Sequence, residues 1–353
     1  MVEPGKLSVS NWWSIQLARV VNPKLAYPFQ SANWDPGIDM WSTKNMRTMR
    51  ATLALDTHDT IGEGPTWVSS AGRIIWTDNA IGLVHEARSD GAGSWRESRS
   101  WMLNRITGAA VPRAKGGFVV ASGTDLLTLD EAGVASTFTS IDDDPSVVKL
   151  NDARCDPQGR LWSGTFTHDF SPGRGALYRF DPDGSVTTIL REVGLSNGLD
   201  WSPDGGTFYY IDSMRRSVDA FDFDPFRGSL SRRRTIVSVP FGEGSPDGMT
   251  VDSEGRLWVA VFGAAEVRQY TPDGELLSRV EISAPAVTSC AFGGSDRQEL
   301  FITSGALPLP EGVARIIGCS AEMARIAHTA KGAGGLFVCR PGATGKPTIP
   351  FAG

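Results

Sequence analysis

Short apolar stretches separated by polar turns recur along most of the chain. Each stretch has about four to six residues rich in Leu, Ile, Val, Trp, Phe and Tyr, which is too short for a helix and typical of a buried strand. A glycine turn precedes each stretch, often with Pro-Asp before the glycine, because Pro presets one backbone dihedral and Gly accepts a positive one. The turn glycines are Gly72, Gly117, Gly159, Gly205 and Gly255, with a degenerate copy near Glu299.

The copies are spaced by roughly 43 to 50 residues, the period at which repeats usually indicate propeller blades. Further strand candidates split by Pro-Asp-Gly turns lie between them, as in residues 176–190 and 267–282. Six four-stranded units that cannot cover their own faces would close into a ring. We therefore predict an all-β fold, a six-bladed β-propeller over residues 51–353. The alternative, a β-sandwich, rarely shows so long a period.

Two segments stand outside the repeat. Residues 1–50 contain four tryptophans among several prolines without periodicity, which predicts an N-terminal arm packed on the propeller or on a partner subunit of a homodimer. Residues 310–333 are predicted to form a short helical insertion near the C-terminus, with Ser320 as N-cap and Glu322 in the first turn. This insertion is expected either to cover one end of the central channel or simply to pack on the surface.

Composition narrows the classes of partner. The chain has 353 residues, of which 41% are hydrophobic and 21% charged, and a net charge of −6. Without clustered Lys and Arg, this charge argues against nucleic acid and membrane surfaces as partners and leaves a small-molecule substrate. The start of the sequence has no basic leader with a long apolar stretch, so we expect a cytoplasmic protein. The four cysteines are far apart and form no C-x-x-C pair, which indicates free thiols.

Oxygen-bearing side chains recur at one offset before the repeated turns. Glu63 lies nine residues before its turn glycine, and Asn151, Asn197 and Asp247 each lie eight before theirs. The first strand of each blade lines the channel, so these groups are predicted to converge on one point. Two carboxylates and two carboxamides favour Ca²⁺, with Mg²⁺ and Mn²⁺ next and Zn²⁺ as a weaker fit. The alternative is that each side chain caps a turn, as Asn-Gly and Asp-Gly often do.

Seven ordered phrases carry a resemblance to a known family. They include GEGPTW, NDARCDPQGRLWSGTF, SNGLDWSPDGGTFYYIDS, PDGMTVDSEGRLWVAVF and the closing FAG. The chain resembles the gluconolactonase and regucalcin (senescence marker protein) family of six-bladed propellers over about residues 55–353. The resemblance implies a divalent metal held by Glu63, Asn197 and Asp247, with Asn151 at the edge of the metal and touching substrate. It also implies that Asp247 is the catalytic base.

Two positions depart from the pattern of that family. Lys149 stands where some relatives carry Arg, which keeps the charge but loses planar bidentate binding. Asp169 corresponds to an acidic residue of relatives and is one methylene shorter. We predict that Lys149, Asn151 and Asp169 bind substrate, and that Asp169 is the second candidate for the base.

A serine hydrolase motif is also present by letter. Gly194 to Gly198 read G-x-S-x-G, but a nucleophile elbow needs a helix after Ser196, and the sequence predicts a strand, a turn and another strand. Only one histidine, His328, lies downstream. The match is therefore predicted to be accidental, and Asn197 is the functional neighbour.

These observations predict a metal-dependent hydrolase that opens a cyclic ester, foremost a sugar lactone. The same scaffold acting on another ester, an organophosphate or a secondary metabolite is an alternative, which a more apolar channel mouth than sugars need would favour. A non-catalytic calcium-binding propeller is the other alternative. That protein would need neither a base nor substrate-binding groups.

Overall fold

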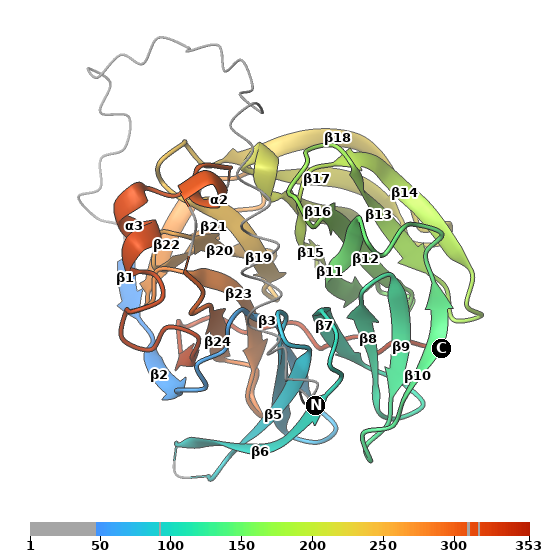
Figure 1. Ribbon diagram of the computed structural model, residues 1–353, viewed down its shortest axis with the longest axis horizontal. Coiled ribbons are helices and arrows are strands. Elements are labelled where there is room, and N and C mark those ends of the chain that lie inside the picture. The colour runs from blue at the N-terminus through green and yellow to red at the C-terminus, as the bar shows by residue number, and fades with distance from the viewer. Residues whose placement is uncertain (1–46, 92, 309–310, 317) are drawn as a thin grey trace, which may run out of the picture.

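The computed structural model describes residues 47–353 except 92, 309–310 and 317, and these residues form six β-sheets arranged as a ring (Figure 1). The predicted all-β six-bladed propeller is confirmed. The predicted arm of residues 1–50 lies outside the described residues apart from its last four, so a homodimer formed through it stays a prediction.

The first three blades follow one another along the chain, each an antiparallel sheet of four strands. The strands of the first blade are β3 (Gly62–Val68), β4 (Arg73–Asp78), β5 (Leu83–Ser89) and β6 (Trp95–Met102). Those of the second are β7 (Thr107–Pro112), β8 (Phe118–Ser122), β9 (Asp125–Leu129) and β10 (Ala135–Ser140). Those of the third are β11 (Val148–Cys155), β12 (Leu161–Thr167), β13 (Gly175–Phe180) and β14 (Val186–Val193).

The last two blades also contain strands from near residue 50, which close the ring. The fourth blade has β15 (Ser196–Trp201), β16 (Thr207–Asp212), β17 (Ser217–Asp224) and β18 (Ser229–Ser238). The fifth has β19 (Ser245–Val251), β20 (Leu257–Phe262), β21 (Glu266–Tyr270) and β22 (Leu276–Glu281), with β1 (Arg47–Arg50) added parallel to β22. The sixth has β23 (Val287–Gly293), β24 (Glu299–Ser304), β25 (Leu336–Cys339) and, as its outer strand, β2 (Thr52–Leu55).

The repeated sequence phrase builds the hairpin between the first two strands of a blade. In the fifth blade, Oδ1 of Asp252 accepts backbone N–H bonds from Glu254 and Arg256, and Oδ2 accepts from Arg256 Nε at 2.8 Å and from Trp258 Nε1 at 3.0 Å. Gly255 has a φ of +86°, which only glycine adopts without strain. The third blade repeats this network with Asp, Arg and Trp at matching positions. The repeated sequence motif thus contains both the turn glycine and the side chains whose hydrogen bonds stabilise the turn.

The hydrophobic core lies between neighbouring blades. One cluster, for example, joins Trp162 and Leu177 of the third blade to Trp201, Phe208 and other residues of the fourth. Each sheet therefore covers the face of the next, which is why the blades need the closed ring for stability.

The insertion near the C-terminus is helical, as predicted. It contains α2 (Glu311–Ile316) and α3 (Ala321–Ile326), and Ser320 caps α3 by accepting a hydrogen bond from the Met323 backbone N–H. A short 3₁₀ helix, η2 (Ser213–Arg215), follows β16. Among the described residues, no helix has the length and apolar character needed to cross a bilayer.

Candidate metal and substrate site

Functional side chains gather where the inner strands begin. The innermost strands of the ring are β3, β7, β11, β15, β19 and β23, and every one of them shifts its register against the second strand near its start. Such bulges re-aim side chains and are common beside functional sites. In four blades the bulges lie at or next to Glu63, Asn151, Asn197 and Asp247, the residues that precede a turn glycine by eight or nine positions. The fold therefore turns these residues toward the axis.

The glycines after the site residues serve close packing of the inner strands. A Cβ on Gly198 would lie 2.7 Å from the Asp247 carbonyl oxygen, and one on Gly248 would lie 2.0 Å from Ser289 Oγ. Asn197-Gly198 and Asp247-Gly248 lie inside β15 and β19. The alternative reading, that these two dipeptides cap turns, is therefore wrong.

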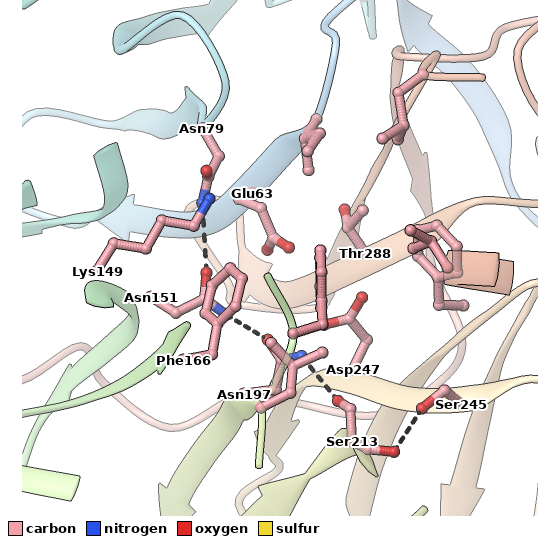
Figure 2. A pocket seen from close by; sticks show the side chains of 16 residues that line it. Glu63, Asn79, Lys149, Asn151, Phe166, Asn197, Ser213, Ser245, Asp247 and Thr288 are labelled. Atoms are coloured by element: carbon pink, nitrogen blue, oxygen red, sulfur yellow. Dashed lines mark hydrogen bonds between the residues drawn. The ribbon is translucent and has the colours of Figure 1, made fainter. Parts of the chain in front are cut away.

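Five of the six predicted site residues line one cavity of about 100 Å³ at this end of the channel (Figure 2). They are Glu63, Lys149, Asn151, Asn197 and Asp247. All five are buried, although they come from four different blades. Their convergence depends on the closure of the ring, and their chemical roles stay predictions.

The sixth predicted residue, Asp169, does not line this cavity. It follows β12 and is exposed, and its carboxylate accepts hydrogen bonds from the backbone N–H and the hydroxyl of Ser171. These bonds hold the pKa of Asp169 below its usual value even though partial burial acts to raise it. The structure thus separates Asp169 from the other five residues.

A chain of hydrogen bonds orders the amides of the site. Asn79 Nδ2 donates to Asn151 Oδ1 at 3.3 Å, and Asn151 Nδ2 donates to Asn197 Oδ1 at 2.7 Å. Asn197 Nδ2 in turn donates to Ser213 Oγ at 2.7 Å, and Ser213 Oγ donates to the Pro246 carbonyl at 2.6 Å. Figure 2 shows this chain running past the two carboxylates. The Asn197 Oδ1 oxygen is thereby held in the cavity.

Three carboxylates crowd the axis. Burial and then the charges of Asp247 and Asp152 raise the pKa of Glu63 well above its usual value. Burial and the charge of Asp152 likewise raise the pKa of Asp247. The pKa of Asp152 is raised to about 6 by burial, against the opposing effect of Arg154. Burial is the main cause of all three shifts, and for Glu63 and Asp247 the repulsion between neighbouring carboxylates adds to it.

The donor set fits a hard divalent cation. Asp247 Oδ1 is buried and has no hydrogen-bond partner among the residues that the structure describes. A cation would satisfy this atom and relieve the repulsion between Glu63 and Asp247, and carboxylate and amide oxygens are the ligands that Ca²⁺ prefers. Within the described ranges no three His, Cys, Asp or Glu side chains group as a metal site, so the set needs the Asn197 amide.

Lys149 brings a buried amine to the edge of the cavity. Its Nζ lies 4.6 Å from the centroid of the Phe166 ring, and burial lowers the pKa of Lys149 to about 7. The amine is thus poised between its charged and neutral forms near neutral pH.

Sequence reasoning missed five polar neighbours of the site. Four of them line the cavity, namely Asn79, Ser213, Ser245 and Thr288, and Asp152 follows Asn151 on β11. Asn79 and Ser213 come from connections between second and third strands, which return to the same end of the channel as the inner strands begin. The alternation of strand direction in a blade could have pointed to Asn79 and Ser213. Asp152 could have been found because it directly follows the predicted site residue Asn151.

The serine of the hydrolase-like motif is part of the core. Ser196 is fully buried on β15, and its Oγ accepts a hydrogen bond from the Tyr210 hydroxyl at 2.8 Å. Strand β16 follows it, so the prediction that no helix follows this serine is confirmed.

The fold and the site define a six-bladed propeller with an oxygen-lined pocket at one end of its axis. Residues 61–306 match the family described as "SMP-30/Gluconolactonase/LRE-like region". This chain belongs to that family, which confirms the resemblance seen in the sequence.

Individual relatives agree with this assignment. Regucalcin of Danio rerio is 36% identical over 73% of this chain and 88% of its own length. YvrE of Bacillus subtilis (strain 168), provisionally named a sugar lactone lactonase, is 32% identical over 86% of this chain and 99% of its own. A solved luciferin-regenerating enzyme superposes with a TM-score of 0.73 at 28% identity, covering 86% of this chain and 99% of that one.

Proposed function

We propose that this protein is a divalent-metal-dependent hydrolase that opens a lactone, a cyclic ester. The observation that carries the proposal is the buried pair Glu63 and Asp247, with one oxygen of Asp247 unpartnered among the described residues, beside the ordered amide of Asn197. Family membership supports the reaction class, since the family description names gluconolactonase.

Glu63, Asn197 and Asp247 would hold the ion, with Asn151 at its edge. The bound ion supplies positive charge at the carbonyl oxygen of the lactone, where negative charge develops during attack. We favour Ca²⁺ from the oxygen ligands, and the calcium-binding regucalcin of Agrobacterium tumefaciens, whose structure shares this fold with a TM-score of 0.76, is in keeping with that choice.

In this proposal Asp247 transfers the proton of the attacking water. A carboxylate oxygen of Asp247 accepts a proton from the attacking water as the water oxygen bonds to the carbonyl carbon. The ring C–O bond breaks, and the same carboxyl returns the proton to the departing alkoxide, giving a hydroxy acid. Asn151 and Lys149 orient the substrate oxygens. Asp169 is a poorer base because its carboxylate is exposed and bonded to Ser171.

A matched pair of variants tests the base. The protein is stripped with chelator, resupplied with Ca²⁺, Mg²⁺, Mn²⁺ or Zn²⁺, and assayed on a panel of lactones. We expect metal-restored turnover that Asp247→Asn abolishes and Asp169→Asn leaves within about twofold. Loss of turnover in Asp169→Asn with retention in Asp247→Asn would reverse the assignment.

A non-catalytic calcium-binding propeller is the competing function. It would bind the ion and show no turnover on any lactone of the panel. The placement of Lys149 and Asn151 in the same cavity favours the enzyme, because a pure ion site needs neither.

A further inference from the structure

The connection between β24 and β25, residues 305–335, is far longer than its counterparts in other blades. The corresponding connections of the other five blades are residues 79–82, 123–124, 168–174, 213–216 and 263–265. All of them lie at the end of the channel where the inner strands begin, because strands alternate in direction within a blade. Figure 1 shows α2 and α3 of the long connection over the fifth blade, with α3 toward its outer strands β22 and β1.

The described residues of this segment, which we call the cover (residues 305–308, 311–316 and 318–335), contact their surroundings at several points. Cys319 Sγ contacts the Phe262 carbonyl at 3.7 Å, and a Cβ on Gly263 would lie only 2.2 Å from that sulfur. Ser283 Oγ donates to the Lys331 carbonyl at 2.7 Å. The close fit at Gly263 shows that the fifth blade accommodates the cover rather than merely touching it.

The cover forms an apolar cluster with side chains at the rim of the site. Val313, Ala314, Ala324 and Ala327 pack with Phe166, Leu195 and Phe262, and Phe170 and Met214 extend the cluster. Among the residues that line the cavity, the cover contributes Leu307 and Val313, both apolar and buried.

The lining of the cavity therefore has two chemical parts. We call the carboxylates and amides its floor, and we call the apolar residues its wall, which are Ile61, Phe166, Phe170, Leu195, Phe262, Leu307 and Val313. Hydroxyl groups placed against that wall would lose their bonds to water without gaining partners. Apolar groups placed there would be stabilised by leaving water.

The floor has few hydrogen-bonding groups to spare for a polyhydroxylated substrate. In the chain described above, Asn151 Nδ2 donates to two oxygens, and Asn79 Nδ2 and Asn197 Nδ2 each donate to one. Ser213 Oγ donates to the Pro246 carbonyl and Ser245 Oγ donates to the Ser213 carbonyl. Glu63, Asn197 and Asp247 are the proposed ion ligands, and Lys149 and Asn151 are the residues proposed to orient substrate oxygens, which is a small set for a polyhydroxylated ring.

We propose that the preferred substrate is a small lactone whose ring carries an apolar substituent, a short alkyl or an aryl group, and not a polyhydroxylated sugar chain. The lactone carbonyl faces the floor and the substituent lies between Val313 of the cover and Phe166 and Phe262. The volume of about 100 Å³ favours a compact ring over a long acyl chain. This proposal rests on the proposed lactonase function.

A series of six-membered lactones tests it in the full chain with the activating ion. The series runs from unsubstituted δ-valerolactone through the methyl-bearing δ-hexalactone to the propyl-bearing δ-octalactone, with glucono-δ-lactone as the polyhydroxylated member. We expect kcat/KM to rise by about tenfold for each of the first methylenes, and glucono-δ-lactone to fall about 100-fold below δ-octalactone.

The outcomes separate the two proposals. Faster turnover of glucono-δ-lactone than of every alkyl lactone would overturn the apolar substituent and leave the lactonase standing. Absence of turnover on all members with all ions would overturn the lactonase. A readout without catalysis then decides the substituent, namely stabilisation of the metal-free protein by propyl-substituted δ-lactam against a polyhydroxylated δ-lactam. Equal or opposite shifts in Tm would overturn it.

A single methyl-to-hydroxyl change locates the effect in the cover. Val313→Thr keeps the side-chain shape and adds a hydroxyl, so we expect kcat/KM for δ-octalactone to fall about tenfold while that for δ-valerolactone stays within about twofold. Val237→Thr makes the same change at a buried position of β18 away from the cavity and is expected to leave both values unchanged. Equal losses on both lactones in Val313→Thr would contradict the placement of the substituent.

Discussion

Asp247 and Asp252 are two buried aspartates at opposite ends of one inner strand region, and their surroundings differ completely. The carboxylate of Asp252 accepts hydrogen bonds from its own hairpin. The donors are two backbone N–H groups and the side chains of Arg256 and Trp258. Asp247 has one oxygen without a partner among the described residues, and its pKa is raised by burial and by Asp152. A buried acid that is satisfied internally holds the fold, and one that is not satisfied marks a ligand site.

The same contrast holds in the fourth blade. Burial acts to raise the pKa of Asp200, yet the charges of Arg154 and Lys346 hold it below its usual value. Lys346 Nζ donates to Asp200 Oδ1 at 2.8 Å. At the end of the channel opposite the site, Arg154 and Lys346 thus lie close to Asp200, whereas the proposed ion ligand Asp247 at the site end has another carboxylate, Asp152, as its charged neighbour.

The largest effect is expected from Asp247→Asn. Turnover should fall about 1,000-fold or more, since both an ion ligand and the proton acceptor are lost. The Tm of the metal-free variant should stay equal or rise, because the change removes repulsion with Asp152. Lactone assays and thermal unfolding measure the two effects. A lower Tm would show that Asp247 stabilises the fold, as Asp252 does.

Asp252→Asn should have the opposite profile. It breaks a buried ion pair and presents donors to Arg256 and Trp258, so the free energy of unfolding should fall by on the order of 3 kcal/mol. Turnover per folded molecule should persist. Urea unfolding and active-fraction kinetics measure the two quantities. A stable but inactive Asp252→Asn variant would contradict the assignment of Asp252 to stability and of Asp247 to turnover.

The pH dependence of the metal-free protein should reveal the crowded carboxylates. Asp152 has a pKa of about 6 when folded, above its value of 3.8 in the absence of the fold. The folded state then binds the proton more tightly, so stability is greatest below about pH 4, and Asp152 contributes a fall of roughly 3 kcal/mol as pH rises through 6. Unfolding in chelator between pH 4 and 7.5 measures the profile, and Asp152→Asn should make the fall smaller, because Glu63 and Asp247 still contribute to it. A profile that rises over this range would show that the charges are compensated.

Binding of the ion should stabilise the folded protein, and this stabilisation should depend on the proposed ligands. A divalent cation at about 100 times its Kd contributes about 2.7 kcal/mol and raises Tm by several degrees. Asn197→Ala should lose most of that shift, whereas Ser196→Ala should keep it. An unchanged shift in Asn197→Ala would remove this amide from the proposed ligands.

The smallest effect is expected from Ser196→Ala. Its hydroxyl serves Tyr210 in the core, so we expect a loss of stability of about 1 kcal/mol and turnover within twofold of the starting protein. If this variant loses turnover while remaining folded, the serine is a nucleophile after all.

The number of blades, the turns and the start positions of the inner strands can all be predicted from the amino-acid sequence. These follow from local chemistry, because the hairpin of Asp252, Arg256 and Trp258 is satisfied within a few residues, and a repeated local unit leaves a visible period. The same period predicts that Glu63, Asn151, Asn197 and Asp247 lie at one end of the channel.

Only the tertiary structure decided what surrounds those residues. Asp169 was predicted to bind substrate because it corresponds to an acidic residue of relatives, but a local turn with Ser171 holds it at the surface. The apolar wall depends on Cys319 reaching Gly263, a contact between segments far apart in the chain that no local pattern encodes. Contacts of this kind arise from ring closure and docking, which is why the sequence could indicate the reaction and only the folded shape could indicate the substrate.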